Sequence, residues 1–206
     1  MKNLIILIVL ILGIISQAQT NFEKGMDKAF ALWTTEKTDE AQNLFERIAN
    51  AEQDNWLPTY YAAYINVIYS FGEKNKDILT AKLKKAQDLT NDATAISPNN
   101  PEIMLLQALI HTAWIAYDGA TYGMTLSGKV VALYNTAESI APNNPRVVLN
   151  KAEWNMGSAR YFGQDTKPFC KDVERSLDLF TNFKPESEFH PNWGKERVEE
   201  LLKDCK

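Results

Sequence analysis

The sequence predicts an all-α fold of stacked helical hairpins with a capping helix at the C-terminus. The first reason is an internal repeat, because "ISPNNPEI" at 96–103 returns as "IAPNNPRV" at 140–147, an offset of 44 residues. A fixed period between about 20 and 50 residues is typical of stacked repeat architectures. The second reason is that apolar residues recur at steps of three and four between these motifs, whereas strand-like alternation is nowhere sustained.

Each Pro-Asn-Asn-Pro element is expected to separate two helices. Its first proline cannot continue the preceding helix, its asparagines suit a turn or a helix cap, and its second proline suits a first helical turn. A weaker copy, "FKPE" at 183–186, places Pro185 in register with Pro98 and Pro142. The elements therefore mark the boundaries between repeating units.

The apolar periodicity predicts the individual helices in chain order. We expect helices near 20–35, 38–53, 56–72, 74–96, 100–117, 124–141, 144–160, 167–183 and 192–204. They form units of about 20–55, 56–98, 99–142 and 143–185, and the helix at 192–204 closes the array. Each hairpin exposes an apolar face that only a neighbouring hairpin can cover, so the units are expected to stack into a single domain over 19–206.

The N-terminus is predicted to be a secretory signal peptide covering residues 1–18. A lysine precedes twelve residues without a polar side chain (4–15), and the small residues Ser16 and Ala18 follow. Cleavage is expected between Ala18 and Gln19. Twelve helical residues span only about 18 Å, which favours this interpretation over an uncleaved membrane anchor. The mature chain is therefore expected to be periplasmic or secreted, without a transmembrane segment.

The composition restricts the classes of partner. The chain has 206 residues, of which 45% are hydrophobic and 23% charged, and its net charge is −4. This is an ordinary globular composition. Because the chain carries no basic excess, we expect it to bind no nucleic acid.

The stretch "GMTLSGKV" at 123–130 resembles a phosphate-binding loop except at its last position, where Val130 replaces Ser or Thr. A phosphate-binding loop follows a buried strand, but residues 101–117 have a helical pattern. We therefore predict a hairpin turn and no nucleotide site. The nearby glycines are interpreted as turn and helix N-terminal residues: Gly119, Gly123 and Gly128.

Cys170 and Cys205 are predicted to form a disulfide. They lie near the start of one predicted helix and at the end of the next, and these ends are neighbours in an antiparallel hairpin. Export to an oxidising compartment would favour the bond. The alternatives are two free thiols or a zinc site with His190, although the spacing typical of zinc ligands is absent.

The repeats resemble the tetratricopeptide repeat. In the first unit Ala29, Leu32, Ala41 and Phe45 occupy the small and large positions of that family, and Ala108, Ala137 and Ala152 occupy small positions later. The resemblance covers about residues 20–187 and is strongest over 96–152. The period of 43 to 44 residues exceeds the family's 34, so helices or turns are lengthened. The resemblance implies an α-solenoid whose first helices line a concave groove.

Aromatic residues on the first helices are the candidate partner-binding residues. The candidates are Tyr60, Tyr64, His111, Trp114 and Tyr117, and the alternative for each is packing between helices. "HPNWG" at 190–194 is expected to be structural, with Asn192 capping the closing helix and Trp193 packing on the fourth hairpin. The alternative is a ligand-binding role, if Trp193 lies at an exposed end.

The preferred function is a non-catalytic exported scaffold that binds a protein or peptide in its concave groove. No catalytic, cofactor-binding or metal-ligating residues are predicted. One alternative is a small-ligand-binding protein or enzyme with a pocket near His111, Trp114 and Tyr117. Another is a structural subunit of a cell-envelope assembly.

Overall fold

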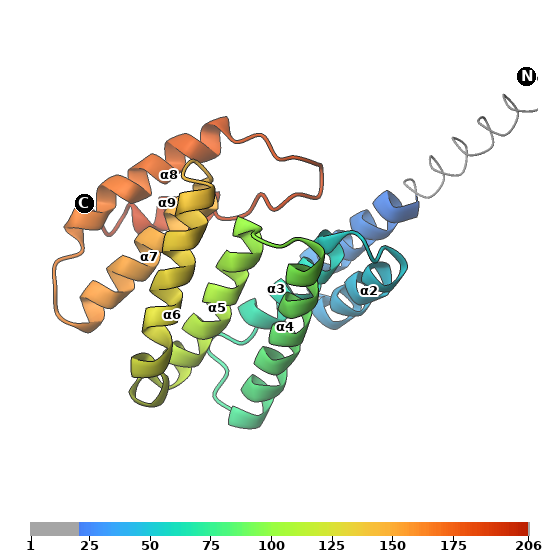
Figure 1. The fold of residues 1–206 in the computed structure, drawn as a ribbon, viewed down its shortest axis with the longest axis horizontal. Coiled ribbons are helices and arrows are strands. Elements are labelled where there is room, and N and C mark those ends of the chain that lie inside the picture. Colours follow the sequence, from blue (N-terminus) through green and yellow to red (C-terminus); the bar gives the residue numbers. More distant parts are fainter. Residues whose placement is uncertain (1–20, 206) are drawn as a thin grey trace, which may run out of the picture.

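The computed structural model describes residues 21–205, and every regular element in that range is helical (Figure 1). This confirms the all-α class. A helix at 21–34 is followed by α2 (Thr38–Ala51), α3 (Trp56–Ile68), α4 (Lys76–Ile96), α5 (Pro101–Tyr117), α6 (Gly119–Ile140), α7 (Pro145–Tyr161), the short 3₁₀ helix η1 (Lys167–Phe169), α8 (Cys170–Asn182) and α9 (Lys195–Leu201). The predicted signal peptide and its cleavage between Ala18 and Gln19 lie outside the described residues.

The Pro-Asn-Asn-Pro elements start helices in the predicted way. Asn100 and Asn144 are the N-caps of α5 and α7, and each side chain accepts a hydrogen bond of 2.9 Å from the backbone N–H two residues ahead. Pro101 and Pro145 occupy the first turn, where a missing N–H leaves no hydrogen bond unmade. Asn99 adopts a φ of 60°, a backbone conformation that asparagine tolerates better than most residues.

From α2 to α9 each α-helix packs against the next in chain order, and α3, α5 and α7 also form a row in which α5 contacts both of the others. Small residues allow these close approaches. Ala108 of α5, Ala137 of α6 and Ala152 of α7 are all buried. None of the helices within residues 21–205 combines the length and apolarity that a membrane span requires.

The turn between α5 and α6 differs from the prediction. Asp118 alone separates the two helices, and its carboxylate caps α6 by accepting hydrogen bonds from the Thr121 N–H (3.0 Å) and hydroxyl (2.6 Å). Gly119 is the first residue of α6, as its interpretation as a helix N-terminal residue allowed. Gly123 and Gly128 lie further inside α6, so interpreting them as turn or N-terminal residues was wrong. Because α5 is a helix where such a loop needs a strand, and "GMTLSGKV" lies inside α6, this stretch is not a phosphate-binding loop.

The glycines of α6 predict a gain in stability. No atom outside the helix backbone lies within 4 Å of a Cβ built at Gly123 or Gly128, so alanine fits at both positions. We expect Gly123→Ala and Gly128→Ala each to raise the free energy of unfolding by about 0.5–1 kcal/mol, measured in urea. Gly194→Ala is the opposing control, because Gly194 has a φ of 111° and its Cβ would lie 3.1 Å from Leu149 and Phe180. A loss of stability in both α6 variants would contradict the prediction.

The predicted disulfide between Cys170 and Cys205 is confirmed. The two Cα atoms are 5.8 Å apart, and the bond joins the start of α8 to the residues that follow α9. It excludes both the free thiols and the zinc site considered as alternatives. The closing helix α9 is shorter than expected, and Gly194 stands at its N-cap instead of Asn192.

Candidate functional site

Residues 183–194, named the strap here, connect α8 to α9 and cross to the N-terminal helices. Figure 1 shows this orange-red segment leaving α8, extending toward the first helices and returning to α9. Phe189 stacks on Phe30 of the first helix, with ring centroids 6.2 Å apart. The Tyr61 hydroxyl of α3 donates a 2.9 Å hydrogen bond to the Phe189 carbonyl. The strap therefore joins the two ends of the array.

The strap also buries two of the predicted partner-binding residues. Trp193 stacks on Tyr64 with ring centroids 4.9 Å apart, and its Nε1 donates a 3.0 Å hydrogen bond to the Tyr60 hydroxyl. Tyr60 is 0% exposed and Tyr64 is 9% exposed, so the expectation that they line an open groove is corrected. Burial, which disfavours the phenolate, raises the pKa of both hydroxyls. Trp193 thus packs on the second hairpin and not on the fourth.

A charged pair lies beneath the strap. Arg146 donates from Nε to Glu102 Oε2 (2.8 Å) and from Nη2 to Glu102 Oε1 (2.6 Å), and Asn144 Nδ2 also donates to Oε1 (2.6 Å). The Arg146 guanidinium lies 4.5 Å from the centroid of the Phe183 ring of the strap. Both charged side chains are almost fully buried, so each depends on the other for its stability.

His190 of the strap lies beside this pair. Its ring meets Trp56 of α3 edge to face at 5.9 Å, and its Nε2 is 3.9 Å from Glu102 Oε1. Burial lowers the pKa of His190, an effect that Glu102 opposes and Arg146 reinforces. We therefore treat the imidazole as neutral at pH 7 and as a packing residue of the strap.

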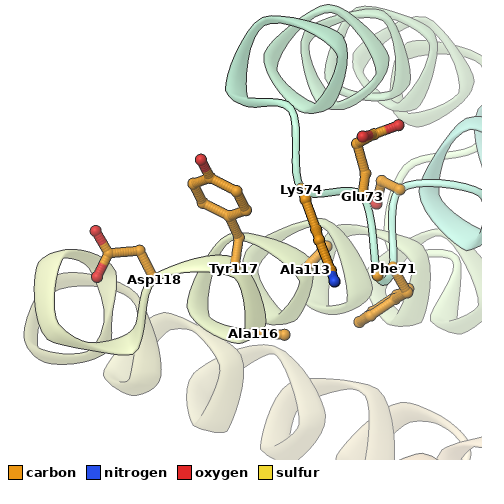
Figure 2. Close-up of a pocket in the computed structure, with 9 residues that line it drawn as sticks. Phe71, Glu73, Lys74, Ala113, Ala116, Tyr117 and Asp118 are labelled. Carbon is orange, nitrogen blue, oxygen red and sulfur yellow. The ribbon is translucent and has the colours of Figure 1, made fainter.

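An open cleft of about 490 Å³ lies on another part of the molecule, between the loop after α3 and the C-terminal end of α5 (Figure 2). Ala113 and Ala116 of α5 are small residues along one side. Figure 2 shows Lys74 between Tyr117 and Phe71. The complete lining is Ser70, Phe71, Gly72, Glu73, Lys74, Ala113, Ala116, Tyr117 and Asp118.

The three charged side chains that line this cleft differ in whether they already bind another group of the protein. Glu73 accepts a 2.9 Å hydrogen bond from the Asn75 N–H and lies 3.8 Å from Lys82 Nζ. Asp118 is engaged as the cap of α6, and the hydrogen bonds from Thr121 lower its pKa. Lys74 forms no ion pair with another residue in 21–205. The cleft therefore combines aromatic walls with the Lys74 ammonium group, which is unpaired within 21–205, and two carboxylates that are held by contacts within the protein.

The structure separates the three residues of the pocket predicted on α5. Tyr117 lines the cleft, whereas His111 and Trp114 do not. His111 Nε2 lies 3.4 Å from Gln107 Nε2, and burial lowers the pKa of this histidine, with a smaller contribution from the positive charge of Lys129. Trp114 packs on Tyr122 of α6 with ring centroids 5.0 Å apart.

Sequence reasoning missed two residues of the cleft, Phe71 and Lys74. They lie in the loop between α3 and α4, and this loop lies beside α5 because both helices pack against α5. The sequence offered one signal, because Gly72 follows Phe71 at the end of an apolar helical stretch and a glycine there indicates a turn. The structure shows that turn, with a φ of 81° at Gly72.

Fold and cleft together define the class: an all-α protein of packed helical hairpins with an open, aromatic-walled cleft. No protein-family model matches the chain, and no curated protein matches it. Among solved structures it is similar to the HusA haemophore from Porphyromonas gingivalis, with a TM-score of 0.76 and 22% sequence identity. The similarity covers 89% of this chain and 92% of the haemophore chain. It shows that the two proteins share a fold.

Proposed function

We propose that the protein is an exported, non-catalytic carrier that binds a flat aromatic ligand with carboxylate groups, of the haem type. The ligand would occupy the cleft between the 69–75 loop and α5. The observation that carries the proposal is the combination of aromatic walls and an available lysine in one open cleft. The fold shared with a haemophore supports the choice of ligand class.

The residues of the cleft suit such a ligand in four ways. Phe71 and Tyr117 offer ring surfaces for contact with a flat macrocycle. Ala113 and Ala116 leave room beside them because their side chains are short. Lys74 provides a positive charge for a carboxylate group, and the Tyr117 hydroxyl is a possible ligand for haem iron, since tyrosine ligates haem in some proteins.

We also propose that the hairpins form a tetratricopeptide-like solenoid. The row of α3, α5 and α7 and the helix starts at Asn100 and Asn144 support it. The strap lies over the N-terminal part of that row, where a peptide groove was expected. A scaffold that binds a peptide there would have to displace Trp193 and Phe189, so the structure favours the small-ligand alternative.

Export is proposed on two grounds that reinforce each other. The N-terminal pattern of residues 1–18 is typical of a signal peptide, and the disulfide between Cys170 and Cys205 suits an oxidising compartment.

The test is titration of the mature chain with haemin, followed by absorbance. We expect saturable binding of one haemin per chain. Lys74→Gln should weaken it about fivefold to tenfold by removing the charge that faces a carboxylate. Tyr117→Phe should shift the haem absorbance bands by removing the hydroxyl. The matched controls are Lys84→Gln on α4 and Tyr161→Phe on α7, both exposed and outside the cleft, and they should bind as the wild type does.

Two results would overturn the proposal. One is the absence of saturable haemin binding by the folded chain. The other is binding that Lys74→Gln and Tyr117→Phe leave unchanged, because this would place haemin outside the cleft.

A further inference from the structure

A second cavity, of about 400 Å³, lies between the helix at 21–34 and the strap, and most of its wall is aromatic. Its aromatic residues are Phe30, Trp33, Tyr61, Phe189 and Trp193. Phe30, Trp33 and Trp193 are only partly buried, so part of their surface remains accessible. Phe30 meets Tyr61 edge to face at 4.7 Å, and Trp33 meets it at 6.4 Å. These contacts hold the walls in place without a ligand.

Two polar groups of this wall are directed away from a ligand. The Tyr61 hydroxyl donates to the Phe189 carbonyl at 2.9 Å. Trp193 Nε1 donates to the Tyr60 hydroxyl at 3.0 Å. Both groups are already hydrogen-bonded within the protein, so neither offers the cavity a free donor. Tyr61 is nearly buried and stacks on Phe45, and one face of Trp193 stacks on Tyr64. The accessible ring surface therefore comes mainly from the partly buried Phe30, Trp33 and Trp193.

The charged side chains that line the cavity are both acidic. Asp27 of the first helix and Glu188 of the strap contribute carboxylates, and both residues are exposed at the rim. Neither forms a salt bridge with any residue in 21–205, so their charges remain available. The other polar residues of the lining are Asn192 and His190, and burial holds the pKa of His190 below its usual value.

From this combination we infer that the cavity is a binding site for a small quaternary ammonium ion. The faces of aromatic rings attract cations, and quaternary ammonium groups are typically recognised by several such rings together. A trimethylammonium group has no N–H, so it needs no hydrogen-bond acceptor inside the cavity. The rim carboxylates add attraction and repel anions. No lysine or arginine is among the residues that line this cavity, whereas Lys74 lines the cleft.

The first experiment titrates the mature, disulfide-bonded chain with choline and follows tryptophan fluorescence, because Trp33 and Trp193 line the cavity. The control ligand is 3,3-dimethyl-1-butanol, which has the shape of choline but no charge. We expect choline to bind at least about tenfold more tightly than this alcohol. Equal binding of the two would show a merely apolar cavity and would overturn the inference.

The second experiment tests whether the cation binds in this cavity. The double variant Asp27→Asn/Glu188→Gln should weaken choline binding about fivefold, and Trp33→Leu should weaken it by at least as much. Glu174→Gln on α8 removes one exposed carboxylate outside the cavity and should leave binding unchanged. Because Asp27 and Glu188 are exposed, their double variant is expected to fold even if Trp33→Leu does not. Wild-type binding by the double variant would contradict the inference.

Two further measurements test whether this site is independent of the cleft and whether the bound cation is free or part of a lipid headgroup. Lys74→Gln and Tyr117→Phe should leave choline binding unchanged, so failure of the haem proposal would not affect this one.

Cosedimentation with phosphatidylcholine vesicles, with and without excess choline, distinguishes a lipid headgroup from a free cation. Choline-sensitive cosedimentation assigns the headgroup, and binding of choline without cosedimentation assigns the free ion. Both results support the quaternary ammonium class, whereas the absence of saturable choline binding overturns it.

Discussion

Glu102→Leu should lower the free energy of unfolding by about 3–5 kcal/mol, the largest effect expected of a single substitution in this chain. The reason is the position of its partner. Arg146 is 0% exposed, and Glu102 accepts two of its hydrogen bonds. Without the carboxylate a buried guanidinium keeps only the Phe183 ring as a charge-stabilising contact. Urea unfolding followed by circular dichroism measures the loss.

The double variant Glu102→Leu/Arg146→Met should be more stable than Glu102→Leu alone. Replacing both members of a buried pair by apolar residues removes the uncompensated charge and the cost of desolvating it. Arg146 Nη1 has no hydrogen-bond partner among residues 21–205, which adds to the benefit of removing the guanidinium. The two single variants and the double variant form a cycle that isolates the coupling between the residues.

A surface pair provides the matched control. Lys151 Nζ lies 2.7 Å from Glu138 Oε2, but both side chains are partly exposed. Glu138→Leu should therefore cost no more than about 1 kcal/mol. If Glu102→Leu and Glu138→Leu had the same small cost, burial would not be what makes the first pair important.

Cys170→Ser/Cys205→Ser should lower the free energy of unfolding by about 3–4 kcal/mol. The bond spans a sequence separation of 35 residues. In the chain-entropy model, closing a loop of this length lowers the conformational entropy of the unfolded chain, and this raises the free energy of unfolding by about that amount. Local unfolding should appear first at α9, a helix of seven residues whose buried side chains are Val198 and Leu201. Urea unfolding under non-reducing conditions measures the total, and limited proteolysis after α8 measures the local loosening.

Reduction of the wild type is the control for this prediction. A phosphine reductant should destabilise the wild type by about as much as the double substitution does, and it should leave the double variant unchanged. A wild type whose unfolding is insensitive to reduction would show that the bond contributes little.

Most of the helices could be predicted from the sequence because local rules determine them. Asn100 and Asn144 cap helices that begin at a proline, and both starts follow from four consecutive residues. The start of α6 shows the limit of this reasoning. The glycines suggested a long turn between α5 and α6. Asp118 caps α6 immediately after α5 ends, so a single residue connects the two helices.

The Glu102–Arg146 pair could have been predicted from the sequence, but it was not recognised. The two residues occupy the same position in successive repeats, 44 residues apart, and carry opposite charges. Stacked repeats bring equivalent positions close together, so opposite charges at one repeat position are a usable sign of pairing.

The cavities depend on contacts that no local pattern encodes. Tyr61 meets Phe189 across 128 residues of sequence, and Tyr60 meets Trp193 across 133. The sequence alone was sufficient for the all-α class and the repeat, because these follow from periodicity. It favoured the pairing of the two cysteines from neighbouring helix ends, and the structure decided between the bond and its alternatives. Only the tertiary structure decided that the strap covers Tyr60 and Tyr64 and that Lys74 joins Tyr117 in the cleft. The physical reason is that burial depends on which distant segment covers a helix face, and periodicity shows only that the face is apolar.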